Sequence, residues 1–380
     1  MKENNVPNRQ TWELRQSNFE LLRIVAMVLI VFSHFAVHSQ FEYADEVISI
    51  PRLWQHFMSM GGKVGVNCFI LISGYFMTQD SSTKPNIEKV LKLWGQVYFY
   101  SIVLLAFCKM LGAGEPIALK EIGKSLMPIV GGRWWFASTY FVLYILHPYL
   151  NQLLNGMDKN MYQRFLLTQF LIWSVIPTFL ISDFQSNELL WFCFLYSFAG
   201  YSHRYGLSER FVKSSWCVVA ICATIMYATD VLLMLIGLKW RAFLKYTTHF
   251  YEMQSIFNVL LSVGLFTAFS NLKVRYSKRI NQIASASFGV YLIHDHFIFR
   301  EFLWNVVFQD SKFQDSLVLI PYSIMVVMVV YVVCSLLELF RQSTIEKRYL
   351  HLVRRYSDYI SDKLIKIEER FCNLILSKDV

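Results

Sequence analysis

The sequence predicts an all-α membrane protein, a bundle of about ten transmembrane helices with a cytoplasmic amphipathic C-terminal helix. Hydrophobic residues make up 55% of the 380 residues and charged residues only 17%, whereas soluble domains carry about 25% charge. Apolar runs of membrane-spanning length recur along the chain. The Lys and Arg residues behind the net charge of +9 lie in short segments between these runs and in the C-terminal tail. That placement indicates membrane topology and not nucleic-acid binding.

A spanning helix requires about 20 mostly apolar residues, and ten segments are candidates, of which 63–78 is short and 134–150 holds polar residues. The expected spans are 19–38, 63–78, 93–112, 134–150, 164–182, 188–205, 213–237, 253–271, 283–303 and 316–340. No internal repeat or separate soluble domain is visible. We therefore divide the chain into an N-terminal segment (1–18), one membrane domain (19–340) and a tail (341–380).

The charge distribution predicts that both termini lie in the cytoplasm. With this orientation Lys and Arg concentrate in the cytoplasmic segments, and the first external loop, FEYADEVISI, is acidic. No short apolar segment followed by a small-residue cleavage site is present, so we expect the first span to remain as an anchor. None of the seven cysteines forms a CxxC pair. We expect neither a disulfide framework nor a metal site.

The tail has its own periodicity. From Ile345 to Leu374, aliphatic and aromatic residues recur every three or four positions, with Lys and Arg between them. This spacing predicts a basic amphipathic helix. Such a helix lies along the anionic inner leaflet, packs on a partner helix, or stays solvated and only sets the topology.

The first span carries two polar side chains, Arg23 and His34, in an otherwise apolar run. Eleven residues of α-helix turn by about 1100°, three turns plus about 20°, and rise roughly 16 Å. The two residues therefore share a helix face, and a buried arginine is costly unless it faces a polar cavity. Alternatively, Arg23 reaches the inner headgroups and His34 is a hydrogen-bonded packing residue. The pair together favours a polar passage through the bundle.

Two further segments carry hydrogen-bonding groups in apolar surroundings. In NCFILISGYFM (67–77), Ser73 and Tyr75 flank Gly74, which permits close backbone approach and by itself is typical of packing. In SASFGVYLIHDHF (285–297), His294 lies at a depth similar to that of His34, with Tyr291 one turn below on the same face. We expect the two histidines to line one cavity.

The fourth expected span begins with Arg133, Trp134 and Trp135. One interpretation is an aromatic belt with a positive anchor at the membrane interface. The other is a sugar platform, on which aromatic faces stack against carbohydrate and the arginine donates hydrogen bonds. The sequence leaves both interpretations open.

Taken together, these segments resemble the acyltransferase-3 family, multi-spanning enzymes that transfer acetyl and other acyl groups to bacterial cell-surface glycans. The resemblance covers nearly all of residues 15–340. It rests on Arg23 and His34 with ten residues between them, and on the segments GVNCFILISGYFM, RWWFASTYFVLY and SFGVYLIHDH. The sequence departs from the family pattern at Asn67-Cys68-Phe69 and at Arg133, which leaves the acceptor open.

The resemblance implies a cytoplasmic acyl-CoA donor, with acetyl-CoA expected, and a glycan acceptor. We predict that His34 is the general base that deprotonates a sugar hydroxyl. His294, Tyr291 or Tyr75 would donate to the oxyanion, and Arg23 would bind CoA. The predicted catalytic residues are His34 and His294, and no metal is expected. The predicted substrate-binding residues are Ser73, Tyr75, Arg133, Trp134, Trp135 and Tyr291.

The expected location is the bacterial inner membrane, and proteins of polysaccharide synthesis are the expected partners. The main alternative function is a transporter or flippase for a lipid-linked glycan, because several spans with buried Arg and His suit transport equally well. A glycan polymerase would be expected to have a larger external loop. A purely structural or sensing membrane protein would make the two histidines incidental.

Overall fold

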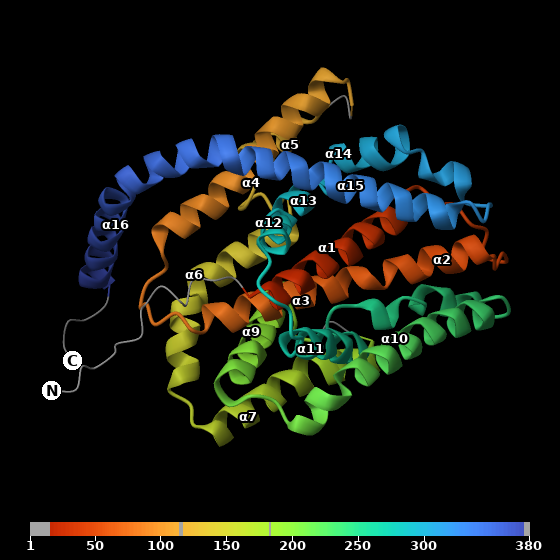
Figure 1. The fold of residues 1–380 in the computed structure, drawn as a ribbon, viewed down its shortest axis with the longest axis horizontal. Helices are drawn as coiled ribbons and strands as arrows, with labels where there is room; N and C mark the ends of the chain where they lie inside the picture. Colours follow the sequence, from red (N-terminus) through yellow and green to blue (C-terminus); the bar gives the residue numbers. More distant parts are fainter. Residues whose placement is uncertain (1–15, 114–116, 182–183, 376–380) are drawn as a thin grey trace.

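The computed structural model describes residues 16–113, 117–181 and 184–375, and all regular secondary structure in this part of the chain is helical (Figure 1). Most of the expected N-terminal segment 1–18 and the last five residues lie outside the described residues. The predicted all-helical class is confirmed for the part that is described.

Six helical segments among the described residues are long and apolar enough to cross a membrane. Five of them correspond to α1 (Ser17–His38), α2 (Ile50–Ser59) with α3 (Gly61–Met77), α4 (Ile87–Met110), α10 (Glu209–Gly237), and η3 (Arg241–Tyr246) through η4 (His249–Tyr251) to α11 (Ile256–Ser270). The sixth, Leu319–Ser357, comprises α15 (Leu319–Arg341), η7 (Gln342–Glu346) and the start of α16 (Lys347–Ile375). The protein is therefore a multi-pass membrane protein.

The other four expected spans are helical but do not meet that criterion. They correspond to α6 (Trp135–Asn155), to α7 (Lys159–Phe170) with the π-helical turn η2 (Leu171–Val175) and α8 (Ile176–Leu180), to α9 (Glu188–Tyr205), and to α12 (Lys278–Ser285), α13 (Ser287–His294), α14 (Phe299–Glu301) and η5 (Phe302–Val307). The last of these is interrupted after Ser285 and after His294. The number of ten spans stays a prediction.

Helix α1 lies in the middle of the bundle (Figure 1). It packs along α3 and also contacts α2, α11, α12, α13 and α15. Glycine makes the α1–α3 contact close, because a Cβ atom added at Gly65 would lie 2.5 Å from the carbonyl oxygen of Ala26. Small residues allow this approach in membrane bundles, where backbone packing replaces the hydrophobic driving force.

Helix α3 packs on α9 through the glycine that the sequence marks as a packing position. A Cβ atom added at Gly74 would lie 3.1 Å from Cα of Tyr196 and 3.1 Å from Cβ of Ala199. The predicted close backbone approach at Gly74 is confirmed. Because α3 contacts α1 on one side and α9 on another, it fixes the wall on which Ser73 lies.

The end of α15 is anchored by a buried ionic network. Arg341 donates to both oxygens of Glu338, at 2.8 and 2.9 Å, and also to Glu346. Tyr100 of α4 donates to Glu338 at 2.6 Å. Buried charges are tolerated in such a network because each has a partner, and the network ties α15 to α4.

Residues 347–375 form the helix that the tail's spacing predicts. The helix packs on α4 of the same chain, where the Tyr349 hydroxyl donates to the Leu91 carbonyl at 2.9 Å and Arg354 pairs with Glu88 at 2.8 Å. Its location in the cytoplasm stays a prediction. Because α16 packs beside α4, the start of the tail adjoins the cavity described next.

Candidate active site

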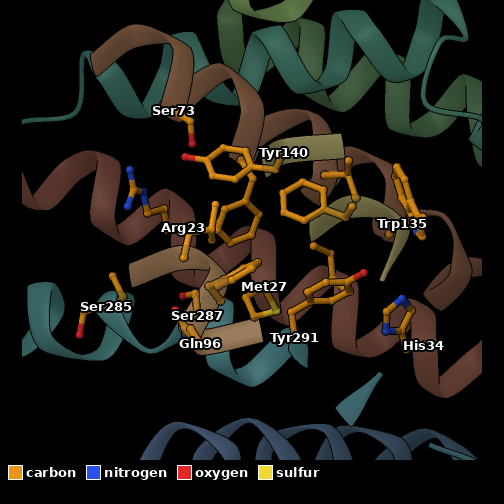
Figure 2. Close-up of a pocket in the computed structure, with 18 of the residues that line it drawn as sticks. Arg23, Met27, His34, Ser73, Gln96, Trp135, Tyr140, Ser285, Ser287 and Tyr291 are labelled. Atoms are coloured by element: carbon orange, nitrogen blue, oxygen red, sulfur yellow. The ribbon is translucent and has the colours of Figure 1, made fainter. Parts of the chain in front are cut away.

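One cavity of about 610 Å³ runs along α1 and is the main candidate site among the described residues. Its walls come from α1, α3, α4, α6, α12, α13 and η7. Arg23 and His34 both line it, and Figure 2 shows them at opposite ends, with Met27 between them. The structure thus brings together on one cavity wall the two polar side chains that helix periodicity places on one face.

The Arg23 end of the cavity is rich in cations. Lys89 and Lys92 of α4 line the cavity with Arg23. Arg23 lies 3.8 Å from Glu20, and Lys92 lies 2.7 Å from Glu346. Three cations beside two carboxylates leave this end positive, which suits an anionic ligand.

The middle of the cavity is mostly uncharged. Met27 and Ile30 of α1 and Phe136 and Tyr140 of α6 line it. Ser73 also lines the cavity and lies toward the Arg23 end in Figure 2. A path of this kind suits an extended, weakly polar chain better than a charged group.

His34 is held from behind by His294. Nδ1 of His34 lies 2.8 Å from Nε2 of His294, and Nδ1 of His294 lies 2.6 Å from the carbonyl oxygen of Val290. A carbonyl only accepts, so Nδ1 of His294 carries the hydrogen, and in the neutral ring its Nε2 is the acceptor. Nδ1 of His34 must then be the donor. The remaining nitrogen of His34, Nε2, keeps its lone pair, which is the form that a general base requires.

A carboxylate lies next to this histidine pair. Oδ1 of Asp295 is 3.9 Å from Nδ1 of His34 and 3.6 Å from Nε2 of His38, and Arg300 lies 3.3 Å from the same oxygen. A negative charge at this distance favours a proton arriving on either imidazole. Asp295 is therefore placed to stabilise the imidazolium form of His34.

The predicted site residues divide into two groups. His34, Arg23, Ser73, Trp135 and Tyr291 line the cavity, and the Tyr291 ring centroid lies 6.4 Å from that of His34. His294 is fully buried behind His34 and does not line the cavity. Both of its ring nitrogens are used within the protein, so it is placed to position His34 and not to donate to a substrate oxyanion.

Three predicted binding residues lie away from the cavity. Tyr75 packs among aromatic side chains, with its ring centroid 4.9 Å from those of Phe19 and His203. The side chain of Arg133 is only 5% exposed, pairs with Glu121 of α5 (Leu119–Leu126), and lies 3.7 Å from the Phe297 ring centroid. The hydrogen bond from Arg133 holds the pKa of Glu121 below its ordinary value.

Trp134 is also buried and packs near His296, with ring centroids 5.7 Å apart. Of the Arg133-Trp134-Trp135 run, only Trp135 reaches the cavity, where Lys63 lies 4.5 Å from its ring centroid. The two tryptophans diverge because Trp134 precedes α6 as its N-cap and Trp135 is its first residue. Neighbouring residues at a helix start point in different directions.

Sequence reasoning missed several cavity residues. His38 lies four positions after His34, so helix periodicity on α1 could have identified it. Lys89 and Lys92 are three residues apart at the start of α4, where they were counted only as topology signals. Gln342 and Glu346 also line the Arg23 end. No sequence signal places the tail there, because its contact with α4 is tertiary.

The fold and the cavity together define a multi-pass helical membrane protein with a polar site inside the bundle, cationic at one end and imidazole-bearing at the other. A family model described as an acyltransferase domain matches residues 16–338. The chain therefore belongs to the acyltransferase-3 family and is an acyltransferase. No curated protein and no solved structure matches the chain.

Proposed function

We propose that the protein moves an acetyl or other short acyl group from cytoplasmic acyl-CoA to a hydroxyl of a cell-surface or exported polysaccharide. The observation that carries this proposal is the single cavity that holds Arg23 at one end and His34 at the other. A cationic end, a weakly polar middle and a basic imidazole are the three features that a phosphate-bearing thioester donor requires in this order.

The Arg23 end is the proposed entrance for acyl-CoA. The phosphates of CoA are anions, and Arg23, Lys89 and Lys92 would bind them by charge-assisted hydrogen bonds. Lys92 must exchange its partner Glu346, 2.7 Å away, for a phosphate oxygen. In this account Glu346 tunes the affinity for the donor because it competes for the same ammonium group.

The distance along α1 suits the pantetheine arm of the donor. Eleven residues of helix between Arg23 and His34 correspond to roughly 16 Å along the axis. The arm is an extended chain that carries amides and no charge. Met27, Phe136 and Tyr140 would contact it, and the thioester would reach the His34 end.

At that end, the hydroxyl oxygen of the acceptor attacks the thioester carbonyl carbon while Nε2 of His34 takes the hydroxyl proton. The carbon–sulfur bond then breaks. Protonated His34 returns the proton to the leaving sulfur, so CoA departs as the thiol and His34 is regenerated. His294 holds His34 in the required tautomer, and Asp295 offsets the transient positive charge. Tyr291, which lines the cavity beside His34, is the proposed donor to the oxyanion.

The acceptor is proposed to enter at the His34 end. Trp135 offers an aromatic face there and Lys63 offers a donor. These groups suit a sugar, which combines apolar C–H faces with hydroxyl groups. The sugar-platform interpretation therefore rests on Trp135 and Lys63, while Arg133 and Trp134 take part in packing and ion pairing.

The proposed location is the bacterial cell membrane, with both termini and the Arg23 end on the cytoplasmic side. Proteins of polysaccharide synthesis are the proposed partners, since they would supply the acceptor. The sequence-based alternative, a transporter or flippase of a lipid-linked glycan, predicts substrate movement without consumption of acyl-CoA. The acyltransferase family assignment favours transfer over transport.

The test is an acyl-transfer assay with the purified full-length protein in vesicles, labelled acetyl-CoA and a polysaccharide extract. We expect label in the polysaccharide and an equal amount of free CoA thiol. Consumption of acetyl-CoA without label in any glycan would overturn the acceptor class. Movement of glycan without consumption of acetyl-CoA would support the transporter instead.

A further inference from the structure

We propose that His34, His38 and Asp295 form a binding site for a nitrogen-preferring transition-metal dication such as Zn²⁺, and that the bound metal switches off acyl transfer. The metal-binding half of this inference is independent of the proposed function, and the inhibitory half rests on it. The cysteine spacing in the sequence predicts no metal site, and it carries no information about His and Asp residues from separate spans.

The three side chains supply suitable ligand atoms at suitable separations. Each residue offers one atom, and the three atoms lie within 4.8 Å of one another. Oδ1 of Asp295 is 3.9 Å from Nδ1 of His34 and 3.6 Å from Nε2 of His38. Ligand atoms in a tetrahedral zinc site with bonds of about 2.1 Å lie roughly 3.4 Å apart. The two separations from Asp295 are within about 0.5 Å of that spacing, and the His34–His38 separation, at most 4.8 Å, would close by rotation of the two imidazole rings.

The two histidines are presented by a rigid element. His34 and His38 are four residues apart on α1, so they lie on one helix face, and their ring centroids are 5.2 Å apart. The packing of α1 against α3 holds that face in place. A preorganised pair of imidazoles loses little side-chain entropy when a metal binds.

His294 completes the set from behind. Its Nε2 lies 2.8 Å from Nδ1 of His34, and its other nitrogen is held by the Val290 carbonyl. A metal-ligating histidine characteristically donates its second N–H to a carbonyl, since this fixes the lone pair on the ligating nitrogen. His294 is therefore positioned either as a fourth ligand, and the third nitrogen donor, or as a support for His34.

The ligand atoms determine which metal ion the site prefers. Arg300 lies 3.3 Å from Oδ1 of Asp295 and opposes any cation at this site, so only an ion that binds imidazole nitrogen strongly should be held. Imidazole donors favour Zn²⁺, Cu²⁺ and Ni²⁺, whereas Mg²⁺ and Ca²⁺ require oxygen ligands. The site should discriminate strongly against Mg²⁺.

The inhibitory effect follows from the tautomer of His34. In the proposed mechanism Nδ1 carries the hydrogen and Nε2 is the base. A metal bond at Nδ1 requires the lone pair there, so the proton moves to Nε2. The nitrogen that should accept the hydroxyl proton is then already protonated. Metal binding and base catalysis by His34 thus require opposite tautomers and exclude each other.

The binding test is a calorimetric titration of the purified full-length protein in detergent with ZnCl₂, and with MgCl₂ in parallel. We expect one Zn²⁺ per chain and no heat of binding from Mg²⁺. His38→Gln and Asp295→Asn should each weaken Zn²⁺ binding at least about tenfold. His351→Gln, at an exposed position on α16, is the matched control and should leave binding unchanged. The absence of stoichiometric binding, or equal affinity in wild type and His38→Gln, would overturn the site.

The activity test separates the two halves of the inference. Zn²⁺ should inhibit acyl transfer by the wild type, EDTA should restore it, and His38→Gln should resist inhibition. Zn²⁺ that binds through His38 but leaves transfer unchanged would overturn the inhibitory half. A protein that binds Zn²⁺ through His38 yet transfers no acetyl group would contradict the proposed function and leave the metal site standing.

Discussion

His34 and His294 have the same side chain but different proposed roles, because their neighbours differ. His294 has a carbonyl on one nitrogen and a histidine on the other, so it is fully engaged inside the protein. His34 has one engaged nitrogen and one edge in the cavity. The direction of the hydrogen bonds, and not burial alone, is the reason that we propose His34 as the base.

Replacement of His34 by alanine tests this assignment. We expect His34→Ala to reduce the turnover number about 10²–10⁴-fold, the usual contribution of a general base. The Michaelis constant for acetyl-CoA should change little, since the cationic end is untouched. His351→Ala is the matched control, and steady-state kinetics on proteins with equal thermal stability is the measurement. Unchanged turnover would remove His34 from the mechanism.

Two substitutions at the Arg23 end are predicted to change the Michaelis constant for acetyl-CoA in opposite directions. Arg23→Ala should raise the Michaelis constant for acetyl-CoA with little effect on turnover. Glu346→Gln releases Lys92, whose side chain is 48% exposed, and keeps an amide oxygen that can accept from Arg341. It should lower that constant by about two- to fivefold, the effect expected of one partly exposed ion pair. Glu88→Gln removes a carboxylate that pairs with Arg354 instead, so it is the control. If all three variants had the same Michaelis constant for acetyl-CoA as the wild type, CoA would not bind at this end.

At the scale of elements, the position of the site depends on how closely α1 lies against α3. A side chain at position 65 would meet the backbone of α1 directly, 2.5 Å from the Ala26 oxygen. We expect Gly65→Val to destabilise the protein by about 1–3 kcal/mol, as overpacking does. Unfolding in detergent measures this. Gly123→Ala, where an added Cβ has no atom within 4 Å, should be neutral, and equal losses in both variants would contradict the packing account.

The loop segment η6 (Asp310–Phe313) is tied to the end of α1 by one buried carboxyl. Ser39 donates to Oδ2 of Asp310 at 2.6 Å, and burial raises the pKa of Asp310 above its ordinary value, although this bond opposes the shift. The folded state therefore holds the proton more tightly than the unfolded state does. Stability from this group is present below about pH 4, the ordinary value for aspartate, and is lost as pH rises through the raised value.

Asp310→Asn should remove this loss. The wild type should lose at most about 1.4 kcal/mol of stability per pH unit from this group across that interval, and the variant should show a flatter profile. Unfolding experiments at a series of pH values measure the difference. Parallel profiles for the two proteins would show that Asp310 does not titrate as the structure indicates.

The lengths of the apolar runs predicted the bounds of α9 and nearly those of α1. Helix periodicity predicted the face shared by Arg23 and His34, because that face depends on local geometry alone. It did not predict that Tyr75 and Arg133 turn away from the cavity, since their orientation depends on His203 and Glu121, partners distant or unmarked in the sequence. The tail's place beside α4 was unpredictable for the same reason. The interruptions within 283–303 escaped prediction because the segment as a whole is apolar, although the second interruption falls on the polar residues Asp295 and His296.

At the scale of the whole molecule, seven of the described helical segments line one cavity. Its two ends differ in charge and lie along one central helix. In the proposed function the donor and the acceptor would therefore approach His34 from opposite ends of the cavity. The buried network of Glu338 and Arg341 holds α15 and α4 around the Arg23 end. The packing, the buried ion pairs and the proposed catalytic residues thus lie on the same set of helices.

The most direct test of this account is an acyl-transfer assay in sealed proteoliposomes, with the donor on one side of the membrane and the acceptor on the other. Labelled acetyl-CoA is enclosed, polysaccharide is supplied only outside, and wild type is compared with His34→Ala. The account predicts labelled polysaccharide outside and CoA thiol inside for the wild type, and neither for the variant. Label that appears only when both substrates are on the same side of the membrane would contradict a cavity that joins a cytoplasmic donor to an external acceptor.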